Sequence, residues 1–168
     1  MMNFDFEKMI PELKDWDLNY QQAESTKKIL GREVRIEPID YWTSFNARFD
    51  YFVLYSRIIW PGFVEHDDCV FLAKEFSVES YDQWRKKLNK TDTEVMLNHR
   101  HITDLFNNSE FKPNLDIVLY IGRYLKEVWT EKLKRDFPKR TFVVSFPEEP
   151  HTPNDLVSYE ISFFQERK

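Results

Sequence analysis

The sequence contains very little cysteine and glycine, and these absences exclude several classes of protein. One of its 168 residues is cysteine (Cys69) and three are glycine. A single thiol makes no internal disulfide and no zinc site built from several cysteines. Gly31, Gly62 and Gly122 stand too far apart for the glycine-rich loops that bind nucleotide phosphates. The Gly-x-Ser-x-Gly motif of serine hydrolases is also absent.

A long hydrophobic run is missing as well. The most apolar stretch, residues 51–60, is interrupted by Ser56 and Arg57 and is much shorter than the ~20 residues of a membrane span. The N-terminus is acidic where an export signal carries positive charge. We therefore expect a soluble cytoplasmic protein that does not enter a membrane. The net charge of −5 makes nucleic acid an unfavourable partner.

The length fits a single compact domain over residues 1–168, which buries roughly 70% of its unfolded surface. Periodicity predicts an α+β fold, with several amphipathic helices packed on a small antiparallel sheet that includes the two C-terminal strands. Helices are predicted at residues 4–13, 18–30, 41–60, 78–88, 92–106 and 115–137, and strands at 33–37, 140–146 and 156–164. We expect the strand near residue 35 to join the C-terminal pair, because two strands alone are marginally stable.

Two segments allow alternatives. Residues 51–60 have high β-propensity, so a strand is the alternative to a helix there. The helix is favoured because the polar residues fall on one side only when they are arranged with the helical period of 3.6 residues. Residues 69–73 fit either a buried strand or the start of a helix.

Several local signals define helix ends. Ser77 opens one helix, residues 91–94 match a capping box, and Asn114 caps the longest helix. Gly122 lies within the apolar stripe of that helix, which predicts a close approach by another element.

His99 and His101 are the first candidates for a functional site. Residues two apart share a face on a strand but point about 200° apart on a helix. Because the capping box and the apolar stripe favour a helix here, we expect the two imidazoles not to share one metal ion. Asp104 lies three residues beyond His101. The candidates for catalysis are therefore His99, His101 and Asp104.

A composite metal site is an alternative to this arrangement. His66, Asp67 and Asp68 lie in the loop that follows the turn at residues 61–62. Together with His101 and Asp104 they offer nitrogen and oxygen ligands. Asn98 and His99 are adjacent polar residues on a face that is otherwise largely apolar. We therefore expect a small-molecule site there if one exists.

Aromatic residues are abundant, with 15 Phe, 8 Tyr and 5 Trp. Most must lie in the core, but exposed Tyr and Trp beside acidic residues are typical of protein-binding surfaces. Trp16, Tyr20, Tyr81 and Trp84 lie in or beside two acidic segments and are the candidates for such a surface.

Our first hypothesis is a non-enzymatic module that presents an acidic, aromatic-rich face to a basic protein partner. An inhibitor or immunity protein that neutralises a cationic toxin or nuclease would fit this profile. The alternative is a small enzyme or a metal- or ligand-binding protein with a polar site around Asn98, His99, His101, Asp104 and residues 66–68. A third hypothesis is a structural domain whose aromatic residues are all core. We expect no cofactor, and we leave catalytic activity open.

Overall fold

The computed structural model describes residues 26–29, 32–35, 43, 47–106, 113–147 and 155–167. The chain divides into two compact units, Met1–Tyr55 and Ser56–Lys168, which are described separately. The single domain expected from the length stays a prediction. Within the described residues, no helix has both the length and the hydrophobicity that a membrane span requires.

The first unit contains a short antiparallel hairpin of β1 (Thr26–Ile29) and β2 (Arg32–Arg35). The strand predicted at 33–37 is therefore confirmed over most of its length. The helix predicted at 18–30 is wrong where it is described, because residues 26–29 pair as a strand. The expected pairing of β2 with the C-terminal strands is also wrong, since its partner is β1. The helix predicted at 4–13 lies outside the described residues.

Helix α4 (Phe49–Ile59) confirms the helical alternative for the apolar segment. The Trp60 N–H donates to the Ser56 carbonyl at 2.8 Å and closes the last turn, and Pro61 then prevents the helix from continuing. None of the α4 residues is buried. Of the helix predicted over residues 41–60, residues 41, 42 and 44–46 lie outside the described residues.

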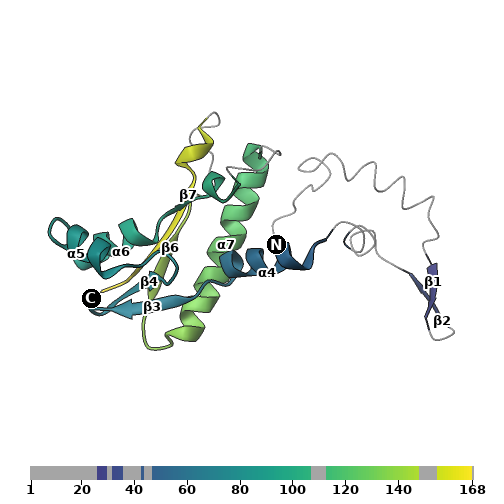
Figure 1. Ribbon diagram of the computed structural model, residues 1–168, viewed down its shortest axis with the longest axis horizontal. Coiled ribbons are helices and arrows are strands. Elements are labelled where there is room, and N and C mark those ends of the chain that lie inside the picture. Colours follow the sequence, from purple (N-terminus) through teal and green to yellow (C-terminus); the bar gives the residue numbers. More distant parts are fainter. Residues whose placement is uncertain are drawn as a thin grey trace. The chain divides into compact units, whose positions relative to one another are not determined.

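The second unit combines helices with small antiparallel sheets, which confirms the α+β fold. Its elements are β3 (Phe63–His66), β4 (Cys69–Leu72), α5 (Val78–Arg85), α6 (Lys90–Asn98), β5 (Arg100–His101), a 3₁₀ helix (Thr103–Phe106), α7 (Leu115–Asp136), β6 (Phe142–Ser145), a second 3₁₀ helix (Leu156–Ser158) and β7 (Glu160–Gln165). Strands β5, β7 and β6 form an antiparallel sheet in that order, with α7 on one side and α5 and α6 on the other (Figure 1).

Strands β3 and β4 form a hairpin through a two-residue turn, which settles the alternatives left open for residues 69–73. Asp67 and Asp68 have φ values of 48° and 61°, as a type I′ turn requires, and aspartate tolerates this left-handed conformation better than most residues. The turn places His66 opposite Cys69. Because residues alternate in the direction of their backbone hydrogen bonds, the N–H groups of residues 70 and 72 then point away from β3.

The buried amide of Asn98, at the end of α6, binds this outer edge of β4. Asn98 accepts a hydrogen bond from the Leu72 N–H at 3.0 Å and donates to the Val70 carbonyl at 2.9 Å. It also donates to the Phe163 carbonyl of β7 at 3.1 Å. The side chain is fully buried, so these three bonds replace all of its contacts with water.

Glu94 lies one turn earlier on the same face of α6 and makes the same kind of bridge. Its carboxylate accepts from the Val70 N–H of β4 at 2.8 Å and from the Gln165 N–H of β7 at 3.0 Å. Arg167 donates to it at 2.6 Å and balances its charge. The two α6 side chains therefore take the place of a backbone ladder between β4 and β7.

The helix caps agree with the sequence at two of three positions. Ser77 and Asn114 are the N-caps of α5 and α7, as predicted. The capping box at residues 91–94 is wrong, because α6 is capped by Asn89, whose side chain accepts from the Asp92 N–H. Glu94 is buried between strands and does not act as a capping residue.

The core forms between α7 and the sheet. The inward stripe predicted for α7 is buried except for Leu115, which is half-buried; its buried members are Val118, Leu119, Leu125, Trp129 and Leu133. Tyr159, just before β7, and Ile161 and Phe163 of β7 belong to the same core and are fully buried. Val157 alternates with these residues in the sequence but is exposed, because it lies in the 3₁₀ helix that precedes β7.

Gly122 allows the close contact that the sequence predicts. A Cβ atom at this position would lie 2.0 Å from Cζ of Phe146, which is buried against the helix. The absence of a side chain therefore lets the end of β6 approach α7.

We expect Gly122→Ala to lower the free energy of unfolding by up to about 2 kcal/mol. Displacement of the Phe146 ring costs ~1–3 kcal/mol, which exceeds the ~1 kcal/mol that alanine gains in a helix. Urea unfolding measures the change, with the exposed Glu127→Ala variant of the same helix as the control. A variant more stable than the wild type contradicts the close contact.

We expect Asn98→Leu to lower the free energy of unfolding by about 3 kcal/mol or more. Leucine fills the space but leaves three buried backbone groups without partners, at ~1–3 kcal/mol for each group. Removal of the exposed cap by Asn89→Ala costs only ~1 kcal/mol and serves as the matched control. An Asn98 variant no less stable than the cap variant shows that the bridge is unimportant.

Candidate functional site

Helix α6 ends at Asn98, so the helix predicted from 92 to 106 is wrong over its second half. His99 is extended, with φ −73° and ψ 146°, and β5 follows immediately. In β5, Arg100 pairs with Ile161 and His101 with Glu160. The hydrogen bonds of Asn98 and the pairing with β7 outweigh the local preference for helix.

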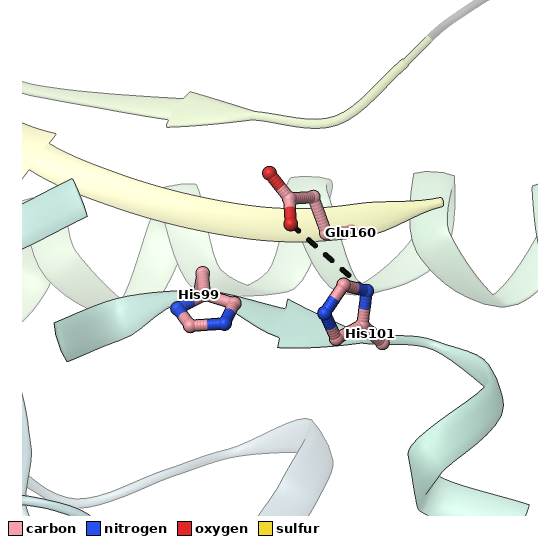
Figure 2. A group of neighbouring side chains, drawn as sticks. All are labelled: His99, His101 and Glu160. Atoms are coloured by element: carbon pink, nitrogen blue, oxygen red, sulfur yellow. Dashed lines mark ion pairs between the residues drawn. The ribbon is translucent and has the colours of Figure 1, made fainter. Parts of the chain in front are cut away.

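The extended backbone reverses the expected orientation of the histidines. Residues 99 and 101 lie two apart in an extended segment, so their side chains share one face. Their ring centroids are 5.5 Å apart with the rings nearly perpendicular, and Figure 2 shows the two imidazoles side by side. The prediction that they point apart is therefore wrong.

Glu160 completes a cluster with His99 and His101. Its carboxylate reaches across from the neighbouring strand and lies 3.9 Å from Nδ1 of His101 (Figure 2). One ligand atom from each of the three residues lies within 4.8 Å of the other two, and no other group of three potential ligands comes this close in the described part of the chain. Sequence reasoning missed Glu160, although the alternation of residues 156–164 placed it on the outward face.

Backbone carbonyls orient both imidazoles. Nδ1 of His99 lies 2.6 Å from the Met96 carbonyl, and Nδ1 of His101 lies 2.6 Å from the Val157 carbonyl. Because a carbonyl only accepts hydrogen bonds, each Nδ1 carries a proton and donates, and each Nε2 then presents a lone pair. Metal-binding histidines commonly have this arrangement, with one nitrogen bonded to the protein and the other to the ion.

The cluster is accessible from solvent. The side chains of His101 and Glu160 are 30% and 49% exposed, and His99 is half-buried. An ion therefore reaches the site without any displacement of the core.

His66, at the end of β3, and the turn residues Asp67 and Asp68 do not belong to this cluster. The His66 ring packs edge-on against Tyr81, with ring centroids 4.7 Å apart. Asp67 accepts a hydrogen bond from the Tyr81 hydroxyl at 2.6 Å and pairs with Lys90 at 3.1 Å. These hydrogen bonds, from Tyr81 first and Lys90 second, lower the pKa of Asp67. Asp68 lies 3.6 Å from Arg140. The two carboxylates thus act in local ion pairs.

The composite site of His66, Asp67, Asp68, His101 and Asp104 is therefore not assembled. Asp104 lies in the 3₁₀ helix after β5 and lines a cleft together with Arg100. Arg100 alternates with the histidines along the strand, so the cleft lies on the opposite face from them. Asn98 was also expected near a ligand, but its side chain hydrogen-bonds to the backbones of β4 and β7.

Of the four aromatic residues predicted for a docking surface, Tyr81 is buried. Tyr81 is only 4% exposed, and burial, followed by its hydrogen bond to Asp67, raises the pKa of its hydroxyl. It is a core residue and is unavailable to a partner. Trp84 is half-buried, and Trp16 and Tyr20 lie outside the described residues. The acidic, aromatic-rich face stays a prediction.

The single thiol is also a core group. Cys69 is fully buried at the start of β4. Burial, and then the nearby Glu94 carboxylate, raise its pKa and keep it protonated. A protonated, enclosed thiol is neither a nucleophile nor a metal ligand.

No protein-family model, curated protein or solved structure matches the chain. The chemistry of its own residues is therefore what indicates a function.

We expect Cys69 to react with a thiol reagent such as dithiobis(nitrobenzoic acid) about a hundredfold more slowly in the native protein than in urea. The reason is the burial of the sulfur and its raised pKa. Ser145→Cys in a Cys69→Ala background puts a thiol at an exposed position and serves as the reactive control. Native labelling of Cys69 as fast as that of the control contradicts the enclosed position.

Proposed function

We propose that the protein binds a divalent transition-metal ion through His99, His101 and Glu160. The observation that carries this proposal is the convergence of two imidazoles and one carboxylate within 4.8 Å on one face of paired strands. Imidazole and carboxylate together suit Zn²⁺, Fe²⁺, Ni²⁺ and Cu²⁺. The docking hypothesis has gained no such support from the described residues.

The distances are compatible with ligation after a small movement. Ligand bonds of about 2.0–2.1 Å in a tetrahedral zinc site separate the ligand atoms by about 3.4 Å. The ligand atoms therefore need to approach one another by up to about 1.4 Å, which rotation about the side-chain χ angles provides. The backbones beneath them are held by the β5–β7 pairing and need not move.

The number of ligands indicates how such an ion would be used. Three protein ligands leave at least one coordination position for water or a second molecule, as in catalytic zinc sites. Structural zinc sites are closed by four protein ligands, commonly with cysteine among them. The proposed site is thus one that binds an exchangeable ligand.

The test is calorimetric titration of the whole protein with zinc chloride at pH 7.5. We expect one ion per chain, and we expect His99→Ala and His101→Ala each to weaken binding by about tenfold or more, because each removes one of three ligands. His66→Gln changes a histidine outside the cluster and should leave the affinity unchanged.

Two results would contradict the proposal. One is the absence of saturable binding to the wild type. The other is binding that His99→Ala and His101→Ala leave unchanged while His66→Gln abolishes it.

A further inference from the structure

A cleft lies on the face of β5 opposite the histidines, within the second unit. Its volume is about 620 Å³. It is formed by the end of α4 and the residues after it, the end of β4, Arg100 of β5, the first 3₁₀ helix and α7. Clefts of about 300–1,000 Å³ are typical of small-molecule sites.

The inner wall of the cleft is apolar. Leu72, Leu125 and Ile161 line it and belong to the hydrophobic core. Trp129 closes the wall, and its indole N–H donates to the Ile58 carbonyl at 3.0 Å, so it offers the cleft an apolar ring. Such a wall favours the hydrocarbon part of a ligand.

Three basic and two acidic side chains line the cleft. Arg57, Lys74 and Arg100 line it, together with Glu75 and Asp104. Glu75 forms an ion pair with Arg100, and Asp104 has an interaction of its own. Arg57 and Lys74 pair with no carboxylate in the described part of the chain, so their charge is available to a ligand.

We infer that this cleft binds a small organic monocarboxylate with an apolar body of about eight carbon atoms, a size that such a volume accommodates. The apolar wall receives the body, and Arg57 and Lys74 bind the carboxylate. A guanidinium donates two parallel hydrogen bonds to a carboxylate, and an ammonium adds a point charge. This site is separate from the proposed metal site, because the two use opposite faces of β5.

The test is a titration of the ¹⁵N-labelled protein with octanoate, followed by NMR at the indole N–H signals of Trp60 and Trp129. Both residues line the cleft, so both signals should shift in a saturable way. Octanol has the same chain without the charge and should bind about tenfold more weakly, because it loses the charge-assisted hydrogen bonds.

Variants identify the groups that recognise the carboxylate. Arg57→Gln and Lys74→Gln should together weaken octanoate binding about tenfold or more. Lys134→Gln removes an exposed cation of α7 that does not line the cleft and should have no effect. His101→Ala should also leave octanoate binding intact, which separates this site from the metal site.

Three results would overturn the inference. The first is the absence of a saturable shift at either indole. The second is equal binding of octanol and octanoate, which requires no variant and so does not depend on folding of an altered chain. The third is unchanged octanoate binding in the Arg57→Gln, Lys74→Gln protein.

Discussion

The packing of the second unit depends on two buried polar side chains, Glu94 and Asn98. They bind the backbone groups of β4 and β7 that a neighbouring strand would otherwise bind. The β3–β4 hairpin alone is only marginally stable, and its outer edge needs hydrogen-bond partners once it is buried. Glu94 and Asn98 are one helical turn apart and supply those partners to β4 and β7 together. A buried carboxylate is costly unless it is fully paired, and here two backbone N–H groups and Arg167 provide the compensation.

The same anchor explains the arrangement of the candidate metal ligands. Asn98 is the last residue of α6, and its amide is held by both β4 and β7. The chain leaves that point already beside β7, so the next residues extend and pair with it. The histidines then share a face and meet Glu160. A structural bridge in the core thus positions a cluster of functional groups at the surface.

The parts of the fold that follow from local chemistry were predictable from the sequence. The caps at Ser77 and Asn114, the stripe of α7 and the contact at Gly122 each depend on residues a few positions apart or on one missing side chain. The end of α6 was not predictable in this way, because it depends on β7, about sixty residues later. The candidate site was missed for the same reason, since the orientation of His99 and His101 changes completely between helix and strand.

Strand β5 has only two residues, and their side chains lie on opposite faces of the sheet. Imidazoles project from one side and the Arg100 guanidinium from the other. A shift of one position against β7 would exchange them, bringing the arginine beside the Glu160 carboxylate and turning the imidazoles toward hydrocarbon. The shift would take the imidazoles away from Glu160 and Arg100 away from the cleft. An insertion or deletion between Asn98 and Ile102 would therefore change both surfaces at once.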